Sequence, residues 1–116
     1  MFRRVLVPLD GSHLAQMALD YTTKIVDPTC EIVLVTAVLR PEIPLYSITP
    51  VVSMNPDYLD VEALRKSARS YLEGVAAKLL ERGFHVTIRV EVDEAAHAIV
   101  QAANALDVDA IIMSTH

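Results

Sequence analysis

The sequence contains a single cysteine and no surplus of positive charge. Cys30 alone cannot form an intramolecular disulfide or a thiolate metal site, so we interpret it as a small buried residue near the start of a strand. The 10 lysines and arginines are outnumbered by 15 aspartates and glutamates, which gives a formal net charge of -5. Because neutralising phosphates requires clustered basic side chains, this composition excludes a sequence-independent nucleic-acid binder.

Glycine is also scarce, which excludes the commonest phosphate-binding loops. The three glycines are at positions 11, 74 and 83, so neither G-x-x-x-x-G-K-S/T nor G-x-G-x-x-G occurs. The G-x-S-x-G elbow of hydrolases is absent around Ser12. The four histidines, at positions 13, 85, 97 and 116, have no metal-ligand spacing to one another or to Cys30. We therefore predict no catalytic residues and no metal site.

Long apolar runs are missing as well. Val5–Leu9, which follows the basic start Met1–Arg4, is too short for a signal peptide, and Asp10 interrupts it. No stretch approaches the roughly 20 apolar residues that cross a bilayer. With 53% hydrophobic residues over 116 positions, the composition fits one compact domain spanning residues 1–116. We expect a cytoplasmic domain that does not contact membranes.

Apolar runs alternate with segments of helical periodicity along the chain. Four apolar segments are typical of strands. Residues 5–9 and 32–39 are uninterrupted apolar runs, residues 85–92 alternate strictly between apolar and polar, and residues 110–113 form a short apolar run near the end. Helices are expected from Ser12 to before Pro28, from Asn55–Asp57 to Gly83, and from Asp93 or Glu94 to about Leu106. The proline-rich segment 40–56 is interpreted as a long surface loop.

This order of elements predicts an α/β fold with a doubly wound parallel sheet. Right-handed crossovers place helices on both faces, and the alternating strand His85–Val92 belongs at an edge. The spatial order 3-2-1-4 follows if the chain reverses across the sheet after the third strand. Spacing predicts these inward residues in the three helices: Leu14, Met17, Ala18, Tyr21 and Ile25; Val61, Leu64, Ala68, Tyr71, Leu72, Val75 and Leu79; Ile99, Ala102, Ala103 and Leu106.

The predicted strand order identifies a crevice between the ends of the first and fourth strands, at Asp10 and Ser114. The residues there allow two interpretations. Asp10 either accepts a hydrogen bond from a ligand or satisfies the free amides of the first helix. Gly11 permits a tight turn and Ser12 caps the helix, so both have structural roles first.

The stretch Val5–Ser12 resembles the opening of universal stress protein domains, whose first strand ends in P-x-D-x-S. Residues 34–38 resemble the family's second strand and residues 107–116 its fourth, so the resemblance covers the whole chain. It implies a Rossmann-like fold of the adenine nucleotide alpha-hydrolase type with five strands. It also implies a role in the stress response and ATP, with or without Mg, bound in the crevice.

The resemblance also implies roles for individual residues. Pro8, Leu9 and Asp10 would line the adenine end, with the Asp10 carboxylate accepting a hydrogen bond from the exocyclic amine. The backbone of Ala37 would pair with the ring edge. Near the ribose would lie Met113 and Ser114.

The chain departs from the family pattern after the fourth strand. Nucleotide-binding members continue with G-x2-G-x9-G-S/T, a helix and a fifth strand, whereas this sequence stops at His116. Asp93-Glu94-Ala95 replaces the common Gly-Asp-Pro. We therefore expect a truncated domain with no assignable phosphate contacts, whose exposed fourth strand is covered by a homodimer partner or by a larger chain.

Three functions remain open at this stage. The first is a regulatory domain that binds ATP and hydrolyses it slowly at most. The second is a dimerisation or regulatory interaction domain of the same fold that binds no nucleotide. The third, an enzyme of the related hydrolase fold, would need S-G-G-x-D-S or H-x-G-H after the first strand, and neither is present.

Overall fold

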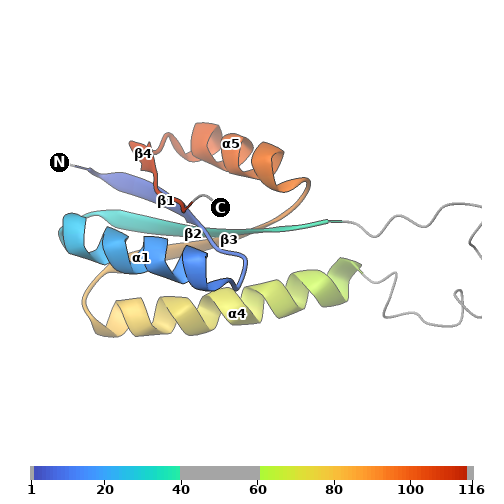
Figure 1. Cartoon of the computed structure of the whole chain (residues 1–116), viewed down its shortest axis with the longest axis horizontal. Helices are drawn as coiled ribbons and strands as arrows, with labels where there is room; N and C mark the ends of the chain where they lie inside the picture. The colour runs from blue at the N-terminus through green and yellow to red at the C-terminus, as the bar shows by residue number, and fades with distance from the viewer. Residues whose placement is uncertain (1, 40–60, 115–116) are drawn as a thin grey trace, which may run out of the picture.

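The computed structural model describes residues 2–39 and 61–114. Its elements in chain order are β1 (Arg4–Pro8), α1 (His13–Ile25), β2 (Glu31–Val38), α4 (Val61–Glu81), β3 (His85–Val92), α5 (Ala95–Leu106) and β4 (Ala110–Ile111). All strand pairs are parallel and the sheet order is β3-β2-β1-β4. Helices α1 and α4 cover one face of the sheet and α5 covers the other (Figure 1). These findings confirm the predicted α/β fold and the strand order 3-2-1-4.

Three predictions concern residues outside the described ranges. They are the proline-rich segment 40–56, the helix start at Asn55–Asp57 and the position of His116. Within the described ranges, no helix combines the length and apolar character needed to span a membrane.

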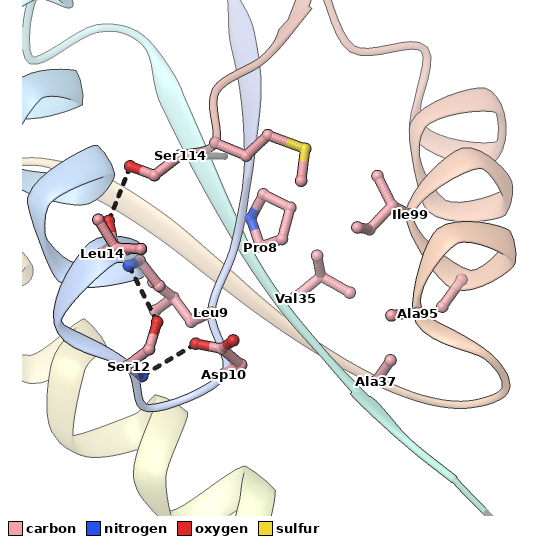
Figure 2. Close-up of a pocket in the computed structure, with 13 residues that line it drawn as sticks. Pro8, Leu9, Asp10, Ser12, Leu14, Val35, Ala37, Ala95, Ile99 and Ser114 are labelled. Carbon is pink, nitrogen blue, oxygen red and sulfur yellow. Dashed lines mark hydrogen bonds between the residues drawn. The ribbon is translucent and has the colours of Figure 1, made fainter. Parts of the chain in front are cut away.

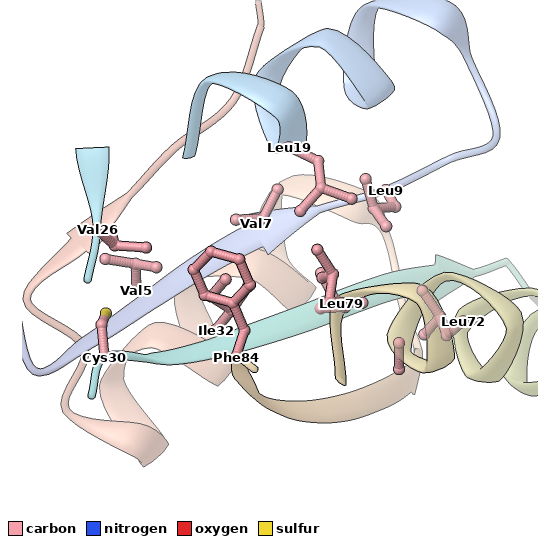
Figure 3. Close-up of a cluster of buried hydrophobic side chains, with 12 residues drawn as sticks. Val5, Val7, Leu9, Leu19, Val26, Cys30, Ile32, Leu72, Leu79 and Phe84 are labelled. Carbon is pink, nitrogen blue, oxygen red and sulfur yellow. The ribbon is translucent and has the colours of Figure 1, made fainter. Parts of the chain in front are cut away.

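The core lies on both faces of β1 and β2. Residues Val5–Val7 and Ile32–Val35 are at most 1% exposed, because each strand has a neighbour on either side and helices above and below. On one face, side chains of β1 and β2 pack with Leu19 of α1 and Leu72 of α4 (Figure 3). On the other face, Leu6, Val33 and Val35 pack with Ala102 of α5. The uninterrupted apolar runs of these two strands follow from burial on both faces.

The fourth strand is shorter and more exposed than predicted. It was expected to be buried over residues 110–113, but β4 ends at Ile111, and Ile111 and Met113 are 41% and 51% exposed. The last ladder bond is donated by the Ile112 amide to the Leu6 carbonyl at 2.9 Å. The next β1 residue on that side is Pro8, which has no amide hydrogen to continue the ladder.

The buried face of α1 is rotated from the predicted one. Met17, Tyr21 and Ile25 are 52%, 58% and 43% exposed, whereas Leu19 and Thr22 are buried beside Ala18. Both sets of residues recur every three or four positions, so spacing alone cannot decide which one faces the sheet. The small side chains of Ala18 and Thr22 allow the helix to approach the sheet closely.

The predictions for the other two helices are largely confirmed. In α4, Val61, Leu72 and Leu79 are buried and Val75 packs on the core, but Leu64 and Tyr71 are 40% and 36% exposed. In α5 the predicted inward residues all contact the core, at positions 99, 102, 103 and 106.

The helix ends follow local chemistry. Gly83 has the left-handed φ of +92° expected just after a helix. At the end of α5 the same conformation is adopted by Asp107, with φ 52°, which the sequence analysis missed. Cys30 is fully buried as predicted, and burial raises the pKa of its thiol.

A polar network joins the strands at the amino end of the sheet. The Glu31 carboxylate on β2 accepts hydrogen bonds from the Thr87 hydroxyl on β3 at 2.7 Å and from Nε of Arg4 on β1. The Arg4 guanidinium also donates to the carbonyl of Leu106 at the end of α5. The Thr87 hydroxyl, and after it the Arg4 guanidinium, lowers the pKa of Glu31 below its usual 4.5.

Glu31→Gln should therefore destabilise the protein in a pH-dependent way. A lowered folded-state pKa stabilises the fold above the unfolded-state value and loses this contribution as pH falls through the folded-state value. We expect a loss of about 1 kcal/mol in the free energy of unfolding near neutral pH, shrinking below about pH 4. Urea denaturation at several pH values measures it. The control is Glu62→Gln, because Glu62 is 75% exposed and lies 3.7 Å from its partner Arg65. A loss that does not change with pH would contradict the prediction.

Candidate functional site

A cavity of about 200 Å³ lies at the carboxyl ends of the strands. It is bounded by the β1–α1 turn, by the end of β2, by the first turns of α5 and by the segment after β4 (Figure 2). Its lining residues are Pro8, Leu9, Asp10, Ser12, Leu14, Ala15, Val35, Ala37, Ala95, Ala98, Ile99, Met113 and Ser114. The six residues predicted from the sequence are all among them.

The β1–α1 turn supplies a charged side chain to the cavity, that of Asp10. Gly11 takes a φ of +83°, which lets the chain reverse between the strand and the helix. Asp10 Oδ1 accepts a hydrogen bond from the Ser12 amide at 2.9 Å, and Ser12 Oγ accepts one from the Ala15 amide at 3.2 Å. Asp10 therefore stabilises the turn and also lines the cavity, so the two interpretations of this carboxylate are compatible.

The end of β2 presents backbone groups next to Asp10. The Leu9 amide donates to the Val35 carbonyl at 2.8 Å, which shows that Val35 directs its backbone groups toward β1. Residues two apart on a strand have the same orientation, so the amide and carbonyl of Ala37 also point to this side. The last β1 residue paired with β2 is Pro8, opposite Val35. Ala37 therefore extends past the end of β1 and can offer a donor and an acceptor to a ligand.

Helix α5 forms a wall of the cavity that the sequence analysis missed. Ala95, Ala98 and Ile99 face the cavity from its first turns, and Ala98 is only 1% exposed. The spacing of these residues continues to the buried Ala102, so their common face could have been recognised from periodicity. The small side chains of Ala95 and Ala98 leave room for a ligand between α5 and the sheet.

The segment after β4 closes another side of the cavity. Met113 is 51% exposed, so its side chain is available at the cavity mouth. The hydroxyl of Ser114 donates to the Leu14 carbonyl in the first turn of α1 at 2.8 Å (Figure 2). This bond connects the end of β4 to the helix that begins beside Asp10.

The lining residues that the structure describes are suited to binding a ligand. Among them, the Asp10 carboxylate faces apolar or hydroxyl-bearing side chains. Across residues 2–39 and 61–114, no group of three or more histidines, cysteines and acidic residues could hold a metal ion. The Ser12 hydroxyl accepts a hydrogen bond from the Ala15 amide, and the Ser114 hydroxyl donates one to the Leu14 carbonyl. The arrangement suits a flat, mostly apolar ring that carries a hydrogen-bond donor.

The pKa of one nearby carboxyl is shifted, but the group lies outside the cavity. Asp93, just before α5, accepts hydrogen bonds from the His97 ring and from the Glu94 amide, which lower its pKa. Neither Asp93 nor His97 lines the cavity. The pair stabilises the start of α5, the helix that lines the cavity with Ala95, Ala98 and Ile99.

Comparisons with known proteins identify a family. The model of the universal stress protein family matches residues 1–116. A search of curated protein sequences gave no significant match.

Several solved structures share the fold. A universal stress protein family member from Burkholderia pseudomallei is 27% identical with a TM-score of 0.75, and the match covers 98% of this chain and 82% of that one. The hypothetical protein MJ0577 is 23% identical with a TM-score of 0.79, covering 100% and 76%. A universal stress protein in complex with cAMP is 16% identical with a TM-score of 0.57, covering 97% and 75%.

Proposed function

Since the chain belongs to the universal stress protein family, we propose that it is a stress-response or regulatory domain that binds an adenine nucleotide, ATP in the first place. The ligand would lie in the cavity at the carboxyl ends of β1, β2 and β4. One observation carries this proposal: the Asp10 carboxylate and the inward-directed backbone of Ala37 lie at one cavity whose other walls are largely apolar. An adenine ring has a matching exocyclic donor, a polar edge and two apolar faces.

The position and size of the cavity support this ligand. Open α/β sheets bind ligands outside the carboxyl ends of their strands where the strand order reverses, which here is between β1 and β4. A volume of about 200 Å³ is below the roughly 300–1,000 Å³ of pockets that enclose whole small-molecule ligands. We therefore propose that the cavity holds the base, with Pro8 and Leu9 on the ring and Met113 and Ser114 toward the ribose. A universal stress protein of the same fold is in complex with cAMP, which is also an adenine nucleotide.

We propose a regulatory role, with ATP hydrolysis that is slow at most. A hydrolase needs a group that activates water and groups that stabilise charge on the phosphates, with or without Mg. Among the described residues that line the cavity there is no lysine, arginine or histidine to take either role. In this proposal the domain is cytoplasmic, and bound ATP regulates it by changing the conformation or surface that the domain presents.

A second candidate is a dimerisation or regulatory interaction domain without a nucleotide. The observation that favours it is the edge strand β4, which pairs only with β1 in the described part of the chain and exposes 41% of Ile111. A homodimer partner or a larger chain would cover this edge. Nucleotide titration separates the two candidates, because only the first requires ATP binding.

Asp10→Asn tests the nucleotide proposal. The asparagine oxygen can still accept from the Ser12 amide, which preserves the turn, while the amide nitrogen now faces the exocyclic amine. We expect a roughly tenfold weaker affinity for ATP, because a hydrogen bond to a charged acceptor is replaced by two opposed donors. ITP carries a carbonyl oxygen in place of this amine, so the asparagine amide can donate to it and the affinity for ITP should not fall. Isothermal titration calorimetry measures both.

The control is Asp20→Asn, because Asp20 is an exposed α1 aspartate whose carboxylate accepts a hydrogen bond from Gln16 in the same helix. Its affinity for ATP should equal that of the wild type. Absence of ATP binding by the wild-type protein at millimolar nucleotide would refute the proposal. An equal loss of ATP and ITP binding in Asp10→Asn would assign Asp10 a purely structural role.

A further inference from the structure

Leu9, the residue before Asp10, is hydrogen-bonded through its backbone to two consecutive residues of β2. The Leu9 amide donates to the Val35 carbonyl at 2.8 Å, and the Leu9 carbonyl accepts from the Thr36 hydroxyl at 2.9 Å. The first bond belongs to the ordinary parallel ladder. The second is a side-chain bond placed where β1 has already left the sheet, since its last paired residue is Pro8.

This side-chain bond controls the orientation of Asp10. The Leu9 carbonyl and the Asp10 amide belong to one planar peptide unit, so fixing the carbonyl fixes the direction in which the chain enters Asp10. The Leu9 side chain is only 2% exposed and packs in the core, which anchors the other end of the residue. Downstream, Gly11 has no side chain to restrict its backbone and cannot provide the same constraint.

Thr36 exerts this control from outside the cavity. Val35 and Ala37, on either side of it, line the cavity, while Thr36 does not. Because successive side chains on a strand point to opposite faces, Thr36 projects to the α1 and α4 side of the sheet. On that side Thr36 borders a second hollow, which Asp10 and Ala37 also line, whereas the base is proposed to lie in the cavity that Thr36 does not line.

We propose that Thr36 is a positioning residue for the nucleotide site, a role that rests on the proposed function. Its hydroxyl holds the Leu9–Asp10 peptide so that the Asp10 carboxylate meets the base in a fixed direction. A binding group displaced by a fraction of an ångström loses much of its hydrogen-bond energy. Thr36 thus raises the affinity of the site without touching the base.

The test compares Thr36→Val, Thr36→Ser and a matched control. Valine keeps the branched shape and removes the hydroxyl, whereas serine keeps the hydroxyl. The control is Thr22→Val, because Thr22 is fully buried on α1, bonds the Ala18 carbonyl at 2.8 Å and does not line the cavity. Both valine variants lose one hydroxyl bond to a backbone carbonyl, so their thermal stabilities should fall similarly.

Titration calorimetry with ATP should show about a fivefold weaker affinity for Thr36→Val, wild-type affinity for Thr22→Val, and recovery in Thr36→Ser. Hydrogen exchange gives a second measurement that needs no ligand. The Ser12 amide, which donates to Asp10 Oδ1, should exchange several-fold faster in Thr36→Val and at the wild-type rate in Thr22→Val.

The two measurements separate the two proposals. If the wild-type protein does not bind ATP, the nucleotide function fails, and exchange at Ser12 still decides whether Thr36 holds the turn. Unchanged Ser12 exchange in Thr36→Val overturns the positioning role. Wild-type ATP affinity in Thr36→Val overturns it as well, and so does an equal affinity loss in Thr22→Val.

Discussion

Replacing Ala98 with leucine is expected to weaken ATP binding about 30-fold while the protein remains folded. The Ala98 methyl group is 1% exposed and lines the cavity between α5 and the sheet. A larger side chain would occupy the space that we assign to the base. Forcing a ligand against it has the cost of overpacking, about 1–3 kcal/mol, and 2 kcal/mol corresponds to roughly 30-fold in affinity.

The matched control is Ala105→Leu, on the exposed side of the same helix. Circular dichroism should show native helix content in both variants, and titration calorimetry should show wild-type affinity for ATP in Ala105→Leu. If Ala98→Leu is folded and binds ATP like the wild type, the base does not occupy this cavity. The prediction involves no hydrogen bond, so it tests the location of the ligand independently of Asp10.

Leu34→Ala is expected to cause the largest loss of stability, about 3 kcal/mol. Leu34 is completely buried at the centre of β2, between β1 and β3, and belongs to the core cluster under α1 and α4. Truncating such a side chain removes buried apolar surface and leaves a cavity, which together cost about 2–5 kcal/mol. Against the roughly 5–15 kcal/mol that stabilises a typical domain, this is a large fraction.

Urea denaturation measures this loss, with Leu80→Ala as the control. Leu80 lies on α4 and is 55% exposed, so its truncation should change the free energy of unfolding by no more than about 0.5 kcal/mol. Equal losses in the two variants would show that β2 is not the centre of the core.

The sheet could be predicted because the burial of a strand determines its pattern of apolar and polar residues. The uninterrupted apolar runs of β1 and β2 and the alternation of His85–Val92 distinguish central strands from an edge strand. The connections between parallel strands then follow the right-handed rule, which leaves few topologies. The amino-acid sequence therefore predicted the order β3-β2-β1-β4 correctly.

The errors arose where residues far apart in the sequence decide the outcome. Spacing of three or four residues fits two faces of α1, and packing against the sheet selects Leu19 and Thr22 over Met17 and Tyr21. The shortness of β4 depends on Pro8 of the neighbouring strand β1, more than 100 positions earlier. Pro8 has no amide hydrogen, so it interrupts the hydrogen-bond ladder between β1 and β4. Neither effect is visible within the segment that it changes.

The candidate site was likewise predicted only in part from the sequence. The strand order predicted that Asp10 and Ser114 lie at one crevice, and the family resemblance added Pro8; all three residues line the cavity. The α5 wall and the Thr36 bond to Leu9 were missed. Periodicity identifies the inward face of α5 but not the cavity beside it, and a strand threonine has no sequence pattern that predicts its hydrogen-bond partner. Asp10 was left open between cap and ligand contact, and its bond to the Ser12 amide shows the first role directly.

The most direct test of the account is a titration of the isotopically labelled protein with ATP, followed by amide chemical shifts. We expect chemical-shift changes that saturate with ATP at the amides around the cavity, those of Leu9, Asp10, Ala37, Ala98 and Met113. Residues at the amino end of the sheet, such as Arg3 and Asp109, should not respond, although they line a separate hollow. No saturable shift at millimolar ATP, or shifts confined to the amino end, would contradict it.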